Sequence, residues 1–456
     1  MKTRIWIALA AMLVVSLSAH AQSAPDPTGD WRGTLQAGAA KLRLALHLGE
    51  TSTLDSLDQG AMGLPARMTV EGRRITITID QVGSIEGELS ADGSTITGFL
   101  NQGGARLPLS FERGTFAAAQ RPQTPVGPFP YRSEEVGYDN PQRPGVHLAG
   151  TLTIPPGSGP FPAVLLITGS GAQDRDETLF EHKPFLVLAD YLTRRGVAVL
   201  RVDDRGLGGS TGASPRDTTA DFATDVEAGV AWLKKHRAID ADRIGLLGHS
   251  EGGAIAPLVA SRDDAIAFVV LLAGPGVPGA DVIVEQVRAI AQAAGAPPAI
   301  AAQNAAMQRG LMDLLLKTPD DAAAQAAITA YFASHGAPAP AEPVIAQLLS
   351  PWYRHYIAHD PRPALRALKM PVLALLGGKD IQVTTAQNLP ALREALQGNP
   401  RARVVELPGL NHLFQTATTG GVEEYGSITE TIAPAALELI SDWIVANGGN
   451  GSRDTP

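Results

Sequence analysis

The chain has 456 residues and contains no cysteine. This absence excludes disulfide bonds, a cysteine nucleophile, a thiolate metal site and a lipid attached to an N-terminal cysteine. A basic stripe is also lacking, since 37 Lys and Arg residues lie scattered among 46 Asp and Glu residues, for a net charge of −9. We therefore expect no nucleic-acid partner. Acidity of this size indicates solubility and not a particular ligand.

Long apolar runs are missing except at the N-terminus. There, Lys2 and Arg4 precede the apolar residues 5–17, and the small-x-small pattern Ala19-His20-Ala21 follows. This order predicts that residues 1–21 are a secretory signal peptide. We therefore expect the mature protein to be periplasmic or secreted by a bacterium. The alternative is a membrane anchor, but the run is too short to span a bilayer comfortably, so no stable membrane insertion is expected.

Residues 22–117 contain short runs in which apolar and polar residues alternate. The clearest, residues 74–79, reads Arg-Ile-Thr-Ile-Thr-Ile. A period of two with β-branched residues is typical of a strand, and glycine-containing turn signals separate the runs. The pattern predicts a small antiparallel β domain, either a meander or a partial barrel. Four prolines from Pro122 to Pro130 then predict a stiff linker over residues 118–135.

Residues 136–447 show a different pattern, in which near-continuous apolar runs alternate with helical stretches. The runs cover residues 163–167, 197–202, 244–247, 266–272, 372–376 and 403–407. Such a pattern predicts an α/β fold with a mostly parallel sheet and helices on both faces. The segment between the fourth and fifth runs has no strand pattern. We expect a helical cap over about 277–369 rather than a disordered loop, since long structureless loops inside a domain are uncommon. Residues 448–456 are expected to form a flexible tail.

A serine flanked by glycines stands out in this α/β region. The stretch Gly248-His-Ser-Glu-Gly252 follows an apolar strand run and precedes the helical residues 252–261. An ordinary tight turn is one interpretation. The strand-turn-helix context instead favours a G-x-S-x-G nucleophile elbow, in which the glycines avoid clashes around a strained serine. We predict that Ser250 is a nucleophile, which requires a histidine base oriented by a carboxylate.

Four histidines follow Ser250 and are candidates for the base. His412 lies in the loop directly after the last strand run, which is where such a base belongs. The other three lie in the expected cap: His335, His355 and His359. The last two have i,i+4 spacing, but no H-E-x-x-H motif accompanies them, so we favour packing over a metal pair. We expect no metal and no organic cofactor.

The carboxylate candidate is Asp380, in the Gly-Gly-Lys-Asp stretch after residues 372–376. A plain turn is the alternative interpretation. The position of Asp380 between Ser250 and His412 favours a role in orienting the histidine. Asp360 and Glu423 are poorer candidates, because they lie on the wrong side of the required strand.

An oxyanion hole requires two backbone N–H groups. One should come from Glu251, which follows the nucleophile, and the other from the glycine-rich loop 168–172. In that loop we predict the N–H of Ser170, with Gly171 as the second choice. The charged residues 173–177 are interpreted as a brace for this loop, with substrate contact as the alternative. The glycines of residues 206–212 do not match G-x-G-x-x-G, so a structural turn is favoured over a dinucleotide loop.

Six stretches, in order along the chain, resemble the α/β-hydrolase superfamily. They are Ala149–Pro155, Leu166–Glu177, Asp203–Ser210, Gly248–Gly253, Gly377–Asp380 and Leu410–His412. The resemblance is to bacterial secreted esterases of the serine aminopeptidase-like and dienelactone hydrolase-like branches, here with an extra N-terminal β domain. It implies a serine carboxylesterase that hydrolyses short- to medium-chain esters through an acyl-enzyme on Ser250, with a small-molecule ester as its partner.

The sequence departs from this family pattern in two places. Thr168-Gly169 stands where many members have His-Gly, and the cysteine of dienelactone hydrolases is absent. Two alternatives to an esterase stay open. One is a peptidase or amidase of the same fold acting on small substrates, because the acyl-enzyme chemistry is shared. The other is a non-catalytic binding protein of the cell envelope.

Overall fold

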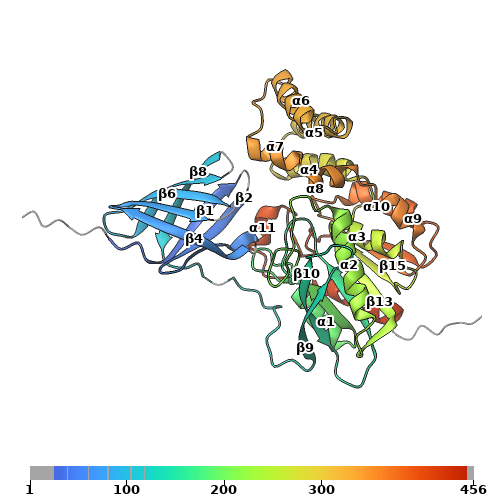
Figure 1. Cartoon of the computed structure of the whole chain (residues 1–456). Coiled ribbons are helices and arrows are strands. Elements are labelled where there is room, and N and C mark those ends of the chain that lie inside the picture. The colour runs from blue at the N-terminus through green and yellow to red at the C-terminus, as the bar shows by residue number, and fades with distance from the viewer. Residues whose placement is uncertain are drawn as a thin grey trace, which may run out of the picture.

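The N-terminal strands close into a barrel, and the rest of the chain forms an α/β unit beside it (Figure 1). The computed structural model describes residues 25–448, apart from residues 38, 39, 60, 80, 81, 103, 104 and 118. The expected signal peptide lies outside the described residues, as do residues 449–456 of the expected tail.

The barrel has eight antiparallel strands, and it is closed because β1 pairs with both β2 and β8. The strands are β1 (Gly29–Ala37), β2 (Ala40–Leu48), β3 (Ser52–Ser56), β4 (Ala61–Glu71), β5 (Arg74–Ile79), β6 (Gly83–Leu89), β7 (Thr95–Gln102) and β8 (Ala105–Arg113). The one-turn 3₁₀ helix η1 (Leu57–Gln59) follows β3. Alternate side chains point inward and form one apolar cluster, which includes Trp31, Leu46 and Ile77. The interior is therefore a packed core.

The α/β unit is built on an eight-stranded sheet in the order β16-β15-β14-β13-β11-β12-β10-β9. These strands are β9 (Arg132–Asp139), β10 (His147–Ile154), β11 (Phe161–Ile167), β12 (Ala198–Val202), β13 (Ile239–His249), β14 (Val269–Leu272), β15 (Val372–Gly377) and β16 (Ala402–Leu407). The strand β10 is antiparallel to its neighbours, and β11 to β16 are parallel. This sheet confirms the predicted α/β-hydrolase fold.

Helices cover both faces of the sheet. On one face, α1 (Pro184–Arg194) and α12 (Pro434–Gly448) share an apolar core with the strands. On the other, the core includes side chains of α2 (Thr219–Leu233), α3 (Gly252–Ala260), α9 (Arg362–Ala367) and α10 (Thr385–Leu396). Because both faces are covered, every residue of β14 and β15 is buried, which explains their uninterrupted apolar sequence.

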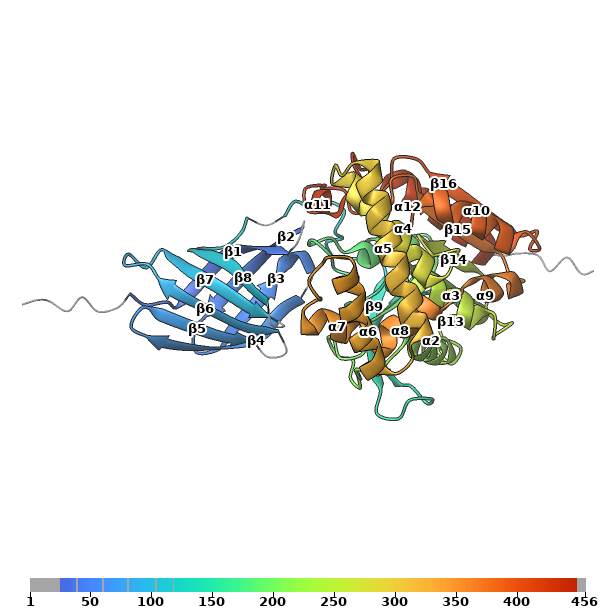
Figure 2. The same ribbon diagram turned by 90° about the horizontal axis from the view of Figure 1, so that it is seen from above.

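The segment between β14 and β15 is helical, as expected for a cap. It holds α4 (Gly279–Ala293), α5 (Pro298–Lys317), α6 (Asp321–Ser334), α7 (Glu342–Leu348), α8 (Pro351–Ala358) and then α9. Met312, Ile328 and Tyr353 belong to a separate small core inside it. Figure 2 shows these helices lying over the sheet of the α/β unit. Within the described part of the chain, no helix combines the length and apolar character needed to cross a membrane.

Candidate active site

Ser250 lies at the sharp turn between β13 and α3. Its φ of +53° is in the left-handed region, which a residue with a side chain rarely adopts. Its N–H donates to the carbonyl oxygen of Leu272, at 2.9 Å, which ties the turn to the neighbouring strand. The flanking glycines are required by space: a Cβ on Gly248 would lie 1.9 Å from the Gly252 carbonyl oxygen. A Cβ on Gly252 would lie 2.2 Å from the carbonyl oxygen of Ile167. The turn therefore has the geometry of a nucleophile elbow.

The structure brings His412 and Asp380 together from the loops after β16 and β15. The Nδ1 of His412 lies 2.8 Å from Oδ2 of Asp380, and both side chains are buried. The other carboxylate oxygen, Oδ1, accepts the N–H groups of Gln382 and Val383 at 2.8 and 2.9 Å. The carboxylate is thus fixed and directs the Nδ1–H of His412 toward itself. This tautomer leaves Nε2 of the imidazole as a proton acceptor.

Ser250 and His412 line the same pocket, between the sheet and the cap. The cap contributes mostly apolar and aromatic side chains: Val282, Ile283, Trp352 and Tyr356. Leu179, Val383 and Leu413 add further apolar surface, and the polar amides come from Gln173, Gln286 and Gln382. Ser170, the first oxyanion candidate of its loop, lines this pocket, whereas Gly171 lines the adjacent cavity. An apolar pocket with a few convergent polar groups is typical of a small-molecule site.

The side chain of Glu251 connects the elbow to the cap. It is buried, and its Oε1 accepts the hydroxyl of Thr219 at 2.7 Å. Both of its oxygens also accept the indole N–H of Trp352 in α8, at 3.0 and 3.2 Å. Glu251, whose backbone N–H the sequence predicts as an oxyanion-hole donor, therefore also anchors a wall of the pocket.

A second buried pair, Glu177 and His249, lies behind the elbow and was missed as a pair by the sequence analysis. Oε1 of Glu177 lies 2.8 Å from Nδ1 of His249 and accepts the N–H of Gly169 at 2.9 Å. Nε2 of His249 donates to the carbonyl oxygen of His412 at 3.0 Å. Burial lowers the pKa of His249, but the charge and hydrogen bond of Glu177, the His412 carbonyl and the charge of Asp380 together outweigh burial, so the pKa is raised. One carboxylate thus holds the loop before Ser170 and the ring that supports His412.

Most of the charged stretch 173–177 forms ion pairs within the α/β unit. Arg175 binds Asp203 bidentately, and Asp176 pairs with the buried Arg201. These contacts agree with the expected brace. Among the charged residues of this stretch, Glu177 is the one that lines the Ser250 pocket. No spacing rule relates residue 177 to residue 249, so only the folded chain brings the two together.

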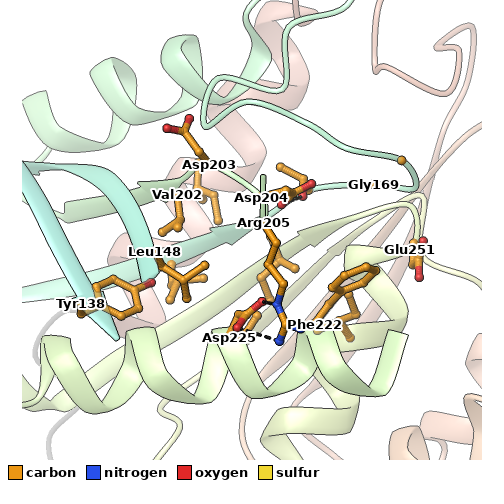
Figure 3. Close-up of a pocket in the computed structure, with 17 residues that line it drawn as sticks. Tyr138, Leu148, Gly169, Val202, Asp203, Asp204, Arg205, Phe222, Asp225 and Glu251 are labelled. Atoms are coloured by element: carbon orange, nitrogen blue, oxygen red, sulfur yellow. Dashed lines mark hydrogen bonds and ion pairs between the residues drawn. The ribbon is translucent and has the colours of Figure 1, made fainter. Parts of the chain in front are cut away.

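A small cavity lies next to the site, beneath the glycine-rich turn after β12 (Figure 3). Arg205 pairs there with Asp225 (Figure 3). The same guanidinium also pairs with Asp217. Oδ1 of Asp204 accepts the hydroxyl of Thr168 at 2.9 Å, and its Oδ2 accepts the N–H of Gln173 at 2.9 Å. Burial raises the pKa of Asp204 to about 8, although both hydrogen bonds act in the opposite direction. The turn therefore supports the predicted oxyanion loop.

The other histidine and carboxylate candidates lie outside the Ser250 pocket. His355 and His359 stack on each other within and at the end of α8, with ring centroids 5.9 Å apart. His335 ends α6 and bonds to a backbone carbonyl of its own helix. Asp360 pairs with Arg362. Glu423 lies in the short helix α11 (Val422–Tyr425). Among the residues that the structure describes, no group of three or more His, Asp or Glu side chains could hold a metal ion.

Comparison with known proteins identifies a family and a curated relative. The model of the X-Pro dipeptidyl-peptidase (S15) family matches residues 144–410. Esterase EstD of Thermotoga maritima is 30% identical over 270 residues, which are 59% of this chain and 58% of that protein. The chain thus matches less than two thirds of the length of this relative.

Solved structures similar to this chain include two hydrolases. One is the Pyrococcus furiosus esterase Pf2001, with 16% identity, a TM-score of 0.41, and coverage of 70% of this chain and 94% of that one. The other is the α/β-hydrolase GrgF from Penicillium sp. sh18, with 15% identity, a TM-score of 0.46, and coverage of 70% and 100%.

Proposed function

The chain belongs to the X-Pro dipeptidyl-peptidase (S15) family of α/β-hydrolases, and within this family we propose that it is a serine carboxylesterase with Ser250, His412 and Asp380 as its catalytic triad. The observation that carries the proposal is one pocket lined both by a serine with left-handed backbone and by a histidine that is already bonded to a buried carboxylate. The substrates would be short- to medium-chain carboxylic esters.

Each residue has a defined role in the proposed reaction. The Oγ of Ser250 attacks the ester carbonyl carbon while Nε2 of His412 takes the hydroxyl proton. Asp380 stabilises the imidazolium that forms. The N–H groups of Glu251 and Ser170, with Gly171 as second choice for the loop, stabilise the oxyanion. His412 then gives the proton to the leaving alcohol, and a water molecule releases the acid by the same steps.

The charge of the pocket favours a neutral ester over an X-Pro peptide. A substrate of a dipeptidyl-peptidase carries a free α-ammonium, and burying that charge requires a counter-charge. Among the described residues that line the pocket, Glu177 is the one carboxylate, and it is already paired with His249. Apart from the hydroxyls of Ser170 and Ser250 and the imidazoles of His249 and His412, the remaining side chains of the lining are apolar, aromatic or amide. The curated relative is also an esterase. A peptidase acting on small substrates is therefore our second candidate.

The proposal can be tested with the wild-type protein and the Ser250→Ala variant. We expect the wild type to hydrolyse p-nitrophenyl acetate, butyrate and octanoate, and to react covalently with a fluorophosphonate at Ser250. Ser250→Ala should lose both reactions and retain its thermal unfolding curve. Faster release of p-nitroaniline from Ala-Pro-p-nitroanilide than of p-nitrophenol would favour the peptidase. Wild-type protein that neither labels nor hydrolyses any of these substrates would favour the non-catalytic binding protein.

A further inference from the structure

The loop between β11 and α1 contains an unusual backbone segment beside the site. Glu177, Phe180 and Glu181 have φ values of +53°, +52° and +63°. Left-handed residues other than glycine, asparagine and aspartate are uncommon and cost conformational energy, so surrounding contacts must hold them. The ends of this segment face different partners.

The barrel holds one end of the segment. The backbone carbonyl of Asp58, in η1, accepts the N–H of Phe180 at 3.1 Å. The Asp58 side chain is buried, and its oxygens accept the backbone N–H and Nε of Arg43 at 2.7 and 2.8 Å. The same guanidinium forms an ion pair with Glu181, with 2.8 Å between Nη1 and Oε1. Arg43 therefore connects a buried carboxylate of the barrel to a carboxylate of the loop.

The connection between the barrel and the sheet adds a second clamp. Nη2 and Nε of Arg121 donate to the carbonyl oxygen of Phe180, at 2.7 and 3.2 Å. The same side chain also donates to the carbonyl oxygens of Gly426 and Ile428. The ring of Phe180 packs edge-on against the buried Tyr425, with centroids 5.9 Å apart. Phe180 is thus fixed on several sides.

The other end of the segment contacts residues that support the proposed catalytic groups. Glu177 binds the N–H of Gly169, directly before Ser170, and the ring of His249. His249 in turn donates to the carbonyl of His412. Leu179, between the two ends, lines the pocket itself. The short loop 177–181 therefore joins the barrel's ion pair at one end to the carboxylate behind the elbow at the other.

We propose that the N-terminal barrel is a positioning element of the hydrolytic site, acting through Arg43 and the loop 177–181 on Glu177. This inference rests on the proposed function. The barrel touches neither Ser250 nor His412 in this mechanism. Instead it holds the left-handed segment in the one conformation that places Glu177 on both Gly169 and His249. A loosened segment would let the oxyanion loop and the His412 backbone shift, which lowers the rate of the chemical step.

The test compares variants on both sides of the ion pair with a matched control. Arg43→Ala removes the barrel's cation, and Glu181→Gln removes the loop's charge without altering the barrel. Arg73→Ala is the control, because Arg73 is also a barrel arginine and pairs with Glu88 on the exposed surface. Steady-state kinetics with p-nitrophenyl butyrate should be expressed per site titrated with fluorophosphonate, so that any unfolded fraction does not count.

We expect Arg43→Ala and Glu181→Gln each to lower kcat at least about fivefold, with KM within about twofold of wild type. A loss of this kind is the signature of interactions that act on the transition state. Arg43→Lys, which keeps a cation, should recover part of the rate, and Arg73→Ala should match wild type. If both loop-contact variants match the control in an active protein, the barrel has no positioning role. If the wild type itself neither labels nor turns over, the proposed function fails and this inference fails with it.

Discussion

Asp204 has a carboxyl group whose charge state should control how stability depends on pH. It lies at the cavity beside the site, where burial raises its pKa to about 8. In the unfolded chain an aspartate has a pKa of about 3.9. Between these two values the folded protein holds a proton that the unfolded chain has released. The free energy of unfolding must therefore fall as the pH rises through this window.

The size of the effect follows from the number of protons. One proton corresponds to a slope of about 1.4 kcal/mol per pH unit, so wild-type stability loses about 2.7 kcal/mol from pH 5 to pH 7 through this residue alone. Asp204→Asn keeps the shape of the side chain. Its carbonyl can accept the N–H of Gln173, and its amide can donate to the hydroxyl of Thr168. The variant has no proton to lose and so lacks this slope.

The assay is urea unfolding of both proteins at pH 5, 6 and 7. We expect the stability of Asp204→Asn relative to wild type to rise by about 1.4 kcal/mol with each pH unit. Asp264→Asn is a suitable control, because the Asp264 side chain is 92% exposed. Parallel pH curves for wild type and Asp204→Asn would refute the assignment of a protonated carboxyl group at this position.

Two further predictions concern the site. Asp380→Asn should lower kcat by about 10³- to 10⁴-fold, because an amide in place of the carboxylate reverses the tautomer of His412. Stopped-time ester assays measure kcat, and a loss below tenfold would contradict the orienting role of Asp380. Trp352→Phe removes the indole N–H bound to the buried carboxylate of Glu251 and should lower the free energy of unfolding by about 1.5–3 kcal/mol. Denaturant curves check this, and an unchanged midpoint would show that the cap is held by other contacts.

The sheet of the α/β unit was predictable because its central strands are buried on both faces. A short, uninterrupted apolar run such as Val372–Leu376 is typical of such a strand, and a glycine-flanked serine after a run of this kind marks the elbow. Asp380 and His412 followed from the order of strands, and the structure places them 2.8 Å apart. Their catalytic roles stay a prediction.

Other strands have too weak an apolar pattern to be predicted from the sequence. The edge strand β9 reads Arg-Ser-Glu-Glu-Val-Gly-Tyr-Asp and begins at Arg132, inside the segment interpreted as linker. An edge strand can leave much of its surface exposed to solvent and therefore contain few apolar residues. No apolar run in the sequence indicated β9. In the barrel, β4 contains Gly63 and Pro65, which usually argue against a strand. We expected either a meander or a partial barrel, and the barrel is in fact closed, because β1 and β8 pair.

Contacts between segments far apart in the chain could not be predicted from the sequence. The pairing of Glu177 with His249 and the clamp of Arg43 on Glu181 join residues with no shared periodicity. They depend on how loops and two separate units pack against each other. Propensity and hydrophobic patterning describe single elements and contain no information about such packing.

Closure of the barrel also affects how molecules of this protein meet one another. Every barrel strand has two neighbours, so that unit offers no free edge for a foreign strand. In the part of the chain that the structure describes, the open edges of sheets are β9 and β16. Both bear charge, with Glu134 and Glu135 on the first and Arg403 and Glu406 on the second. Charged open edges oppose strand addition, so crowding at high concentration should lead to little β-aggregation of the folded molecule.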